Sequence, residues 1–508
     1  MRRAEDLEFA LAPRMPGVSR QSWLYGEIRT AVHCGRLAPG ARLPPSRDFA
    51  RQLGVSRGTV LAALVQLIAE GYLVGAVGKG TFVSTRLPAR PGSAVAPSLA
   101  VHKAEGRLSR RGVLLAESPF AIGGRPQAPR PFRPNQPDLS AFPFALWNRI
   151  AARRTRLSQR AMLAEGDARG YRPLRRAIAE HLRYSMRIDC SDDQVLIVGS
   201  VQQALDLCAR LLLDPQDEVW MEDPGYPGAL RIFQAAGAKV VGVPVDRNGI
   251  DVETGLRRAP GARLAYVTAG RQSPLGVPLT LERRLALLRW AEQAGACVIE
   301  DDYDSEYRYL GSPLAALKSL DTRGRVIYAG SFSKLLFPSL RLAYVVVPDW
   351  LGDPFAAALS LTARHMSLLP QAVLHEFMAE GHYGRHIRRM RLTYGERAAA
   401  LEDVIARRMD GLLSILPITT GIDATAFLPA AADDASVARQ AIAAGLETRP
   451  LSAYAIEAAA PSGLVLGFAA FDRPQMEAGA ATLAKVLEAA LTSKRGRKKS
   501  REVRSCPF

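Results

Sequence analysis

The chain has few of the features that mark secreted, disulfide-stabilised or membrane-spanning proteins. Its 508 residues include only five cysteines, which are scattered and form no CxxC pair: Cys34, Cys190, Cys208, Cys297 and Cys506. A disulfide framework and a metal site are therefore not expected, and a reducing compartment fits. No run approaches the roughly 18 apolar residues of a membrane span, and the opening stretch MRRAEDLEFALAPRMPG lacks the continuous apolar segment of a secretion signal. We expect a cytoplasmic protein without membrane contact.

Acidic residues are also few relative to basic ones. The chain has 67 Lys and Arg residues and 49 Asp and Glu residues, which gives a formal net charge of +18. Such an excess attracts polyanions, nucleic acid first and anionic membranes second. The alternative is that the charge reflects only solubility and an arginine-rich composition.

The composition changes along the chain and predicts four segments. Residues 18–85 are mixed and compact in pattern, which indicates a small domain. Residues 86–131 are rich in Pro, Arg and Ser, so we expect a linker. Residues 132–490 alternate apolar runs with amphipathic helical patterns and form the main domain. Residues 491–508 include SKRGRKKSREVRS and are predicted to be a disordered basic tail.

Short apolar runs recur through the main domain, and longer helical patterns separate them. Such an order predicts crossover units and a mostly parallel sheet covered on both faces, an α/β fold. Ligands of these sheets bind beyond the carboxyl ends of the strands. The predicted strands are VLIV (195–198), EVWM (218–221), KVVGV (239–243), LAYV (264–267), CVIE (297–300), VIYA (326–329) and AYVVV (343–347).

The small N-terminal segment has the pattern of three helices. Ser46 and Ser56 are predicted to cap the second and third, and Gly54 supplies the turn between them. This pair of helices is typical of a helix-turn-helix. The residues expected to face the core are Leu24, Ile28, Val32, Phe49, Ala50, Leu53, Val60, Leu64, Leu67 and Ile68.

In a helix-turn-helix the start of the second helix of the pair meets base edges in the major groove, so Ser56, Arg57 and Thr59 are predicted to contact DNA. The stretch YLVGAVGKGTFV (72–83) reads as a strand, a tip and a strand, and it places Lys79 where a wing would meet phosphate or a minor groove. The alternative is a small helical bundle with a hairpin and no role in DNA binding.

Residues 24–83, from LYGEIRTAVHCGRLAPG to GYLVGAVGKGTFV, resemble the GntR-type winged helix. The resemblance implies that Arg47, the Arg after LPxS, also touches DNA. The chain has PPS where PSS or PSE is commoner.

In the main domain, SFSKLLFPSLR (331–341) places Lys334 just after a predicted strand, beside the hydroxyls of Ser331 and Ser333, with Arg341 seven residues further on. A desolvated lysine has a lowered pKa and becomes a nucleophilic amine, and an arginine fork suits a phosphate. The alternative is a surface lysine beside a helix-capping serine.

The segment IEDDYDSEY (299–307) puts Asp301 and Tyr303 at the end of another predicted strand. Asp301 can pair with a protonated ring nitrogen, and Tyr303 can donate to a phenolic oxygen. The alternative is a metal or solvated acidic cluster, which the absence of a nearby histidine and the apolar start of the segment disfavour.

Two further turns complete the set. VGSVQQALDL (198–207) joins a strand to a helix whose first amides, at Ser200, Val201 and Gln202, can bind phosphate. EDPGYPG (222–228) presents Tyr226 after a strand, where it can stack on a ring. A lysine, a carboxylate, a phenol donor, a phosphate cradle and a stacking ring are what pyridoxal 5′-phosphate (PLP) requires.

Together these motifs resemble fold-type I aminotransferases, and the strings EDPGYPGA, IEDDYDSEYRY, SFSKLLFPSLRL and RPLSAY resemble in particular the MocR/GabR regulators, over roughly residues 20–490. The resemblance implies a GntR-type winged helix fused to a PLP domain with a large, mostly parallel mixed sheet and a small α+β part. It also implies a PLP aldimine on Lys334, Asp301 at the pyridine nitrogen, Tyr303 at the phenolic oxygen, and Arg341 with Ser331 at the phosphate. Head-to-tail homodimers and amino-acid or amine effectors are implied as well.

The chain departs from these relatives at several positions. AGRQSPLG (269–276) has Arg271 and Ser273 where SHQFPxG is common, GSVQQAL has Ser200 and Val201 where SGAQQAL is usual, and Glu165 stands where relatives often have a tyrosine that reaches the partner subunit's phosphate. Each change bears on how PLP binds. The late stretch LVLGF (464–468) lacks the carboxylate-binding arginine of ordinary aminotransferases, so Arg449 is our candidate for the effector.

We therefore expect a PLP-dependent, double-stranded-DNA-binding transcription regulator that senses an amino acid or amine at Lys334. Two alternatives stay open. One is an active aminotransferase with a regulatory DNA-binding domain, and the other is a regulator whose large domain only dimerises.

Overall fold

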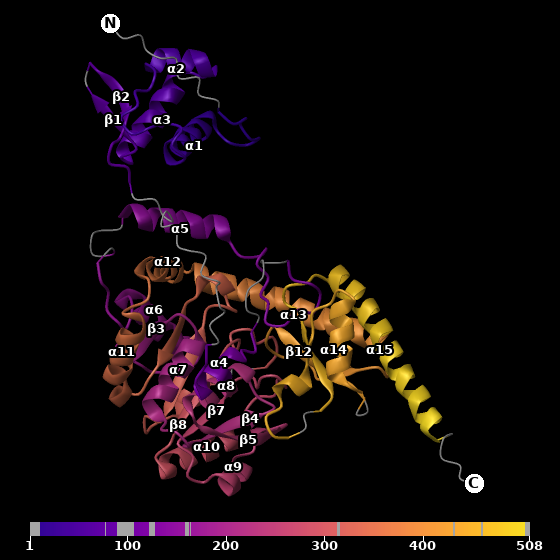
Figure 1. The fold of residues 1–508 in the computed structure, drawn as a ribbon. Helices are drawn as coiled ribbons and strands as arrows, with labels where there is room; N and C mark the ends of the chain where they lie inside the picture. Colours follow the sequence, from indigo (N-terminus) through magenta and orange to yellow (C-terminus); the bar gives the residue numbers. More distant parts are fainter. Residues whose placement is uncertain are drawn as a thin grey trace. The chain divides into compact units, whose positions relative to one another are not determined.

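The structure is a computed structural model that describes residues 11–76, 78–88, 106–120, 128–157, 162, 164–311, 315–429, 432–458 and 461–502, the last twelve of these by backbone alone. The chain divides into two compact units, Met1–Gly106 and Arg107–Phe508. Figure 1 shows both units coloured along the sequence. Each unit is described by itself.

The first unit is a winged helix. Three helices surround an apolar core, and a two-stranded antiparallel wing follows them, with Leu73 opposite Val83. Ser56 caps the third helix by accepting from the Thr59 amide at 3.1 Å, as predicted. The turn residue Gly54 has a φ of +61°, a conformation that glycine adopts at little cost. The elements are α1 (Arg20–His33), α2 (Ser46–Leu53), α3 (Arg57–Ala69), β1 (Leu73–Ala76) and β2 (Gly80–Val83).

Two details of this unit were predicted wrongly. Helix α2 begins at Ser46 itself and its cap is Pro45, because the extended backbone of the proline already sets the entry into the helix. The Ser46 hydroxyl instead accepts from Nε of Arg57, at 3.3 Å. Ile68 was expected in the core but is 39% exposed, since Leu64 and Leu67 fill the inward face of α3.

The second unit contains an eight-stranded sheet in the order β3-β10-β9-β8-β7-β4-β5-β6. All seven predicted runs form strands of it, and the pairs from β9 through β5 are parallel. Strand β10 runs antiparallel to both β3 and β9, and β6 runs antiparallel to β5. The strands are β3 (Val195–Val198), β4 (Glu218–Asp223), β5 (Lys239–Asp246), β6 (Gly249–Ile250), β7 (Leu264–Val267), β8 (Cys297–Asp302), β9 (Val326–Ser331) and β10 (Ala343–Val346).

Helices cover both faces of this sheet, which is why its strands are apolar throughout. Side chains alternate between the faces, so Val219 and Met221 of β4 pack in one core while Trp220 packs in another, stacked on Trp290 at 3.8 Å. One face carries α7 (Val201–Leu212), α8 (Pro227–Ala236) and α11 (Asp349–Ala363). The opposite face carries α6 (Arg172–Ser185), α9 (Val252–Arg258), α10 (Leu281–Ala294), α12 (Leu368–Ala379) and α13 (His382–Arg408).

A smaller α+β part follows, as expected from the resemblance. Its four-stranded antiparallel sheet has the order β11-β12-β14-β13, and two helices pack beside it (Figure 1). The elements are β11 (Ser414–Ile415), β12 (Asp423–Phe427), α14 (Asp434–Ala443), β13 (Arg449–Pro450), the 3-10 turn η4 (Leu451–Tyr454), β14 (Gly463–Gly467) and α15 (Arg473–Glu502). Helix α5 (Phe144–Leu157) precedes the large sheet in sequence and contacts α12.

The predicted linker is not wholly a linker. It contains helix α4 (Arg110–Ala116), which packs on α8, and Nε of Arg111 donates to the carbonyl oxygen of Ala235 in the last turn of α8 at 2.6 Å. Terminal carbonyls of a helix need such donors, so α8 provides a docking point that composition does not reveal. Residues 89–105 and 121–127 of the predicted linker lie outside the described residues.

The predicted disordered tail is also partly helical, because α15 continues to Glu502. Its last turns consist largely of Ala, Leu, Lys, Arg and Glu, which are strong helix formers. Residues 503–508 lie outside the described residues. Within the described ranges, no single helix is long and apolar enough to cross a membrane, and only α2 with α3, bent by 116° at their break, pass that test as a pair.

Candidate functional site

A cavity of about 450 Å³ lies at the edge of the large sheet where the parallel strands β7, β8 and β9 end. Because the carboxyl ends of parallel strands meet at one edge, residues far apart in sequence gather here. The small sheet also contributes, through β13 and η4. The lining residues are Phe120, Asn135, Ser200, Val201, Gln202, Tyr226, Tyr266, Thr268, Ser273, Asp301, Tyr303, Ser331, Lys334, Arg341, Arg449 and Tyr454.

Asp301 is the most unusual side chain of the cavity, because only one of its carboxyl oxygens has a partner. Oδ2 accepts from the hydroxyl of Tyr266 at 2.6 Å. Oδ1 is buried, and no described residue donates to it. Burial raises the pKa of Asp301 to about 6. A buried acceptor without a partner is costly, so the position fits a ligand that brings its own N–H.

Lys334 lies in the same cavity, just beyond β9. Its Nζ is 3.9 Å from the ring centroid of Tyr303, so the lysine stands over the face of that ring. Burial lowers the pKa of Lys334, while the charges of Asp304, Asp423 and Asp301 act in the opposite direction. A lowered pKa increases the fraction of neutral amine, which is the nucleophilic form.

The start of α7 forms another wall. Ser200 caps this helix by accepting from the Gln203 amide at 3.2 Å, and Val201 and Gln202 follow in its first turn. The side-chain amide of Gln202 donates to the hydroxyl of Tyr226 at 2.7 Å and so fixes that ring at the start of α8. The backbone amides of Ser200, Val201 and Gln202 and the positive end of the dipole of α7 suit an anion.

Ser331 and Arg341 also line the cavity, and Arg341 has a φ of +52°, in the left-handed region that few non-glycine residues adopt. Ser333 is not among the described residues that line it, so its role as a cofactor ligand stays a prediction. Its backbone amide donates to Oγ of Ser331 at 3.2 Å, so Ser333 contributes to the shape of the loop rather than to the wall.

Arg449 reaches the cavity from the small sheet. It lies directly opposite Val465 of β14, the late strand in which the sequence shows no arginine. The neighbouring strand therefore supplies the cation that the late strand lacks. Tyr454 also lines the cavity, close enough to Arg449 for the charge of the guanidinium to act on its phenol.

Several cavity residues were not predicted from the sequence: Phe120, Asn135, Tyr266, Thr268 and Tyr454. A polar Tyr266 inside the apolar run LAYV was a usable signal, and RPLSAY contains Tyr454. Asn135 and Phe120 precede the predicted strands by dozens of residues and carry no local motif.

The departures from related sequences have different outcomes. Arg271 is buried and donates to the hydroxyl of Tyr303 at 2.8 Å. It therefore contacts a residue of the cavity wall without lining the cavity itself. Ser273 lines the cavity directly. Glu165 lies outside it and pairs with Arg364 at 3.1 Å, where both side chains are more than two-thirds exposed.

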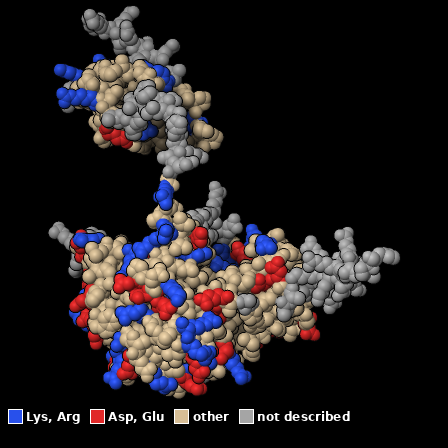
Figure 2. All heavy atoms as spheres, turned by 60° about the horizontal axis from the view of Figure 1, so that its bottom comes forward, with Lys and Arg blue, Asp and Glu red and all other residues tan. Residues whose placement is uncertain are grey.

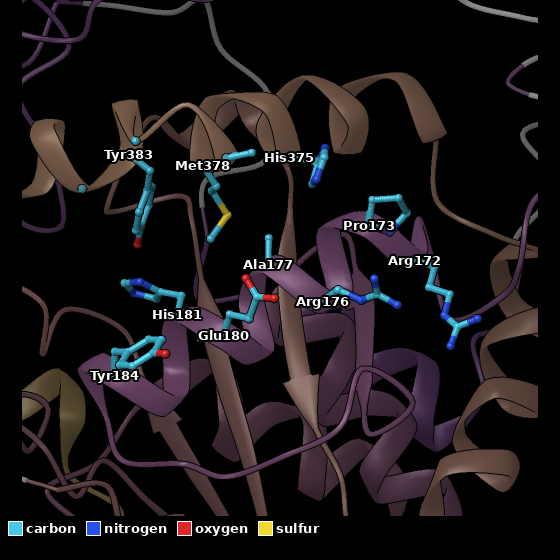
Figure 3. A pocket seen from close by; sticks show the side chains of 13 residues that line it. Arg172, Pro173, Arg176, Ala177, Glu180, His181, Tyr184, His375, Met378 and Tyr383 are labelled. Carbon is cyan, nitrogen blue, oxygen red and sulfur yellow. The ribbon is translucent and has the colours of Figure 1, made fainter.

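The surface also has a larger hollow, of about 670 Å³, between α6, α12 and the start of α13 (Figure 3). Arginine and histidine side chains such as Arg172, Arg176 and His375 surround it. It contains none of the residues predicted for cofactor binding, so the smaller cavity at the strand ends is the candidate site.

On the winged helix, the residues predicted to meet DNA lie around the starts of α2 and α3 and on the wing. Arg47, Arg57 and Lys79 are exposed. The hydroxyls of Ser56 and Thr59 are 2.8 Å apart at the cap of α3. Residues 18–85 hold eight Lys or Arg residues against three Asp or Glu residues. Figure 2 shows acidic and basic side chains interspersed on the face of the large unit that it draws.

The comparisons with known families match both units. Residues 21–83 match the gntR family of bacterial regulatory proteins, and residues 135–483 match the aminotransferase class I and II family. The chain belongs to the MocR-type regulators of the GntR family. The gntR-type helix-turn-helix makes this regulator a DNA-binding protein, and homologues with the aminotransferase fold are typically dimers.

Curated relatives of the regulator share both units. It is 40% identical over 458 residues to the probable rhizopine catabolism regulatory protein MocR of Rhizobium meliloti, covering 90% of this chain and 91% of that protein. It is 32% identical to the pyridoxine biosynthesis regulator PdxR of Corynebacterium glutamicum, with 92% and 95% covered. It is 33% identical to the transcriptional regulator TauR of Rhodobacter capsulatus, with 78% and 81% covered.

Solved structures similar to the large unit are PLP enzymes. Kynurenine aminotransferase of Pyrococcus horikoshii matches with a TM-score of 0.67 and 26% identity, over 76% of this chain and 95% of that one. The α-aminoadipate aminotransferase LysN of Thermus thermophilus matches with 0.66 and 28%, over 71% and 92%. The aminotransferase class I and II family is PLP-dependent, so PLP is the cofactor of this domain. The free oxygen of Asp301 fits the ring N–H that PLP presents when its nitrogen is protonated.

The raised pKa of Asp301 predicts how PLP affinity of the full-length apoprotein depends on pH. Above pH 6 the carboxyl is ionised and can accept from a ring N–H, whereas below pH 6 it is mostly protonated. PLP affinity is expected to fall as pH drops through about 6, approaching tenfold per pH unit below it. Absorbance titrations with PLP between pH 5 and 8 measure this.

Asp301→Asn is expected to weaken PLP binding by about 10- to 100-fold at pH 7.5 and to flatten this step, because it removes the ionised partner. Glu300→Gln is the matched control, since Glu300 is equally buried but accepts from the amides of Leu317 and Lys318 instead of facing the cavity. An unchanged pH profile in Asp301→Asn would contradict the assignment.

Proposed function

We propose that this regulator senses a small amino acid in the Lys334 cavity and converts its occupancy into a change of DNA affinity. The observation that carries the proposal is the buried, unpartnered Oδ1 of Asp301 in the same cavity as Lys334 and Arg449. Cofactor and effector sites thus share one space of about 450 Å³, which favours a small effector.

In this proposal the cavity wall holds PLP at each of its functional groups. Lys334 is the amine that bonds to the cofactor, Asp301 accepts from its ring nitrogen, and Tyr303 donates to its phenolic oxygen. Tyr226 would stack on the ring. Ser331, Arg341 and the amides of Ser200, Val201 and Gln202, which line the cavity, would hold the phosphate. When bound, PLP supplies an aldehyde that reacts with primary amines and a ring that withdraws electrons.

Arg449 supports an effector with a carboxylate. A guanidinium binds a carboxylate through two parallel hydrogen bonds, and this one enters the cavity from the small sheet, beside Tyr454. An effector that joins Lys334 on one side to Arg449 on the other needs a primary amine and a carboxylate. Amino acids have both groups, and simple amines lack the second.

Helix α8 offers a route from the cavity to the segment that continues toward the winged helix in sequence. Its cap is Tyr226 in the cavity wall, and its last turn accepts the hydrogen bond of Arg111 from α4. Phe120, which follows α4, also lines the cavity and lies 6.5 Å from the ring of Tyr226. A ligand that binds one arrangement of these elements better by about 1–3 kcal/mol shifts the DNA-binding state by the same free energy.

For the DNA side, we propose that Ser56, Arg57 and Thr59 meet base edges while Arg47 and Lys79 meet the backbone. A head-to-tail homodimer would present two winged helices and so contact two half-sites. Its place of action would be the cytoplasm, where bacterial DNA is found.

Replacement of Lys334 tests the sensing mechanism. Full-length protein with excess PLP is expected to show a visible absorbance band and to retain the cofactor after borohydride reduction. Lys334→Ala is expected to lose both, together with the effector response, because Lys334 is the only lysine among the described residues that line the cavity. Its DNA affinity without effector should stay within about threefold of wild type, since the winged helix is unchanged.

Lys239→Ala is the control, because Lys239 is an exposed lysine of the same unit, paired with Glu218 at 2.7 Å. It should keep the band. A colourless wild type that borohydride cannot fix would refute the sensing mechanism and favour a domain that only dimerises. Many turnovers per site with an amino acid and a keto acid would instead support an active aminotransferase.

Arg449→Gln should separate effector classes. Because only carboxylate effectors use the guanidinium, their apparent affinity is expected to fall by about tenfold or more, while PLP affinity and the response to simple amines change little. A spectral titration with a panel of amino acids and matched decarboxylated amines measures this. Equal losses for both groups of compounds would show that Arg449 does not select the carboxylate.

Arg57→Ala is expected to reduce operator affinity by about 1–3 kcal/mol, roughly 5- to 150-fold, if the side chain reads a base. Arg29→Ala removes the same charge from α1, where the guanidinium bonds to Tyr25 at 3.0 Å, and should change affinity far less. Binding assays at fixed salt with specific and scrambled DNA measure both variants. Equal effects of the two variants would remove Arg57 from the base-reading residues.

A further inference from the structure

Arg271 occupies a site built around its guanidinium, in the loop after β7. The side chain is 6% exposed, and Nη2 donates to the backbone oxygen of Asp423 at 2.5 Å. Nη1 donates to the Tyr303 hydroxyl at 2.8 Å and lies 3.4 Å from Oδ2 of Asp304. Gly421 gives it room, because a Cβ there would lie 2.4 Å from Nε of Arg271.

The hydrogen bond from Arg271 restricts the direction of the Tyr303 hydroxyl. A guanidinium has only donors, so the phenolic oxygen must accept from it and cannot give its proton back. The Ser273 hydroxyl lies close to the same phenol and lines the cavity. Arg271 occupies one acceptor position of the phenolic oxygen, so the Tyr303 proton must go to another group. On the cavity side these groups are Ser273, whose hydroxyl can donate or accept, and any acceptor that a ligand brings into the cavity.

Arg271 also balances the buried charge beside Lys334. Asp304 is 2% exposed, and its Oδ1 has no partner among the described residues, so Arg271 is the cation that offsets it. Removal of that cation leaves an unpaired acid next to the lysine and favours the protonated amine. The ionisable groups around Lys334 and Tyr303 are Asp301, Asp304, Asp423, Tyr226, Tyr266, Arg271, Arg341 and Arg449.

We propose that Arg271 and Ser273 form a positioning pair that fixes the Tyr303 hydroxyl as a donor into the cavity, so that it is already aimed at the phenolic oxygen of PLP when PLP arrives. This inference rests on the proposed function and deepens it. The two departures from related sequences, Arg271 and Ser273, then need not weaken PLP binding, because both residues lie at the Tyr303 hydroxyl. The positioning effect of the pair acts through Tyr303, so this effect must disappear when that hydroxyl is absent. The charge that Arg271 supplies to Asp304 is a separate contribution, which a substitution that keeps the charge leaves in place.

The test is a double-mutant cycle in the full-length protein. Arg271→Lys keeps the positive charge beside Asp304 but lacks the guanidinium fork that holds the Tyr303 hydroxyl. It is expected to weaken PLP binding by about tenfold, the contribution of one charged hydrogen bond, and to move the pH midpoint of the bound-cofactor absorbance upwards, because a misdirected Tyr303 hydroxyl stabilises the ionised phenolic oxygen less. Tyr303→Phe is expected to show a similar loss. The double variant should bind PLP no more weakly than Tyr303→Phe alone, because both changes remove the same interaction.

Ser273→Ala is a milder probe that keeps the test available if Arg271→Lys folds poorly. It should weaken PLP binding by about two- to tenfold and show the same dependence on the Tyr303 hydroxyl. Arg284→Lys is the matched control, because Arg284 is equally buried but donates to the backbone oxygens of Leu279, Ala269 and Ala315. It should lower thermal stability without moving the absorbance midpoint.

Additive losses in the cycle would overturn the inference, because Arg271 would then act independently of the hydroxyl. An unchanged affinity and midpoint in both Arg271→Lys and Ser273→Ala would overturn it as well. In either case a coloured wild type that borohydride fixes leaves the proposed function standing. A colourless wild type removes the proposed function itself.

Discussion

The site depends on a balance of buried charge at the end of strand β8. Asp301, Asp304 and Asp423 share a water-poor volume with Lys334 and Arg271. Each buried ion costs several kcal/mol unless partners compensate for the lost hydration. The protein supplies a cation for Asp304, yet no residue in the described ranges donates to one oxygen of Asp301. A group that brings a positive N–H to this oxygen completes the balance, which links cofactor binding to the electrostatics of the whole pocket.

The sheet and the small α+β part have different roles around this balance. The strand ends of the large sheet are anchored on both faces and hold Asp301, Lys334 and Tyr303 in fixed positions. Arg449 comes from the small sheet, through a strand of only two residues. A ligand bound to both parts therefore favours one arrangement of the small sheet against the large one. In the proposed function, this bridging of the two parts is how a bound effector would shift the state of the regulator.

The two units also show how function is added to a fold. Similar solved structures are aminotransferases, whereas the relatives that share both units are named as regulators. The same strand-end chemistry thus occurs in enzymes and beside a winged helix. Helix α4 packs on α8, and Phe120, which follows α4, lines the cavity.

The sequence by itself determined the strands of the large sheet, the winged helix and the motifs around Lys334, Asp301 and Tyr226. These features depend on side-chain periodicity and on turns within a few residues, which a single sequence displays. It misjudged Ile68, whose side chain is exposed because Leu64 and Leu67 fill the inward face of α3.

Only the tertiary structure decided which residues of the site are hydrogen-bonded to one another. The bond from Tyr266 to Asp301 joins positions 35 apart, and that from Arg271 to Asp423 joins positions 152 apart. No local pattern encodes such pairs, because they arise from the order in which the strands are laid side by side. The docking of α4 on α8 and the entry of Arg449 from the small sheet belong to the same class. Residue types were readable in advance, but their partners were set by topology.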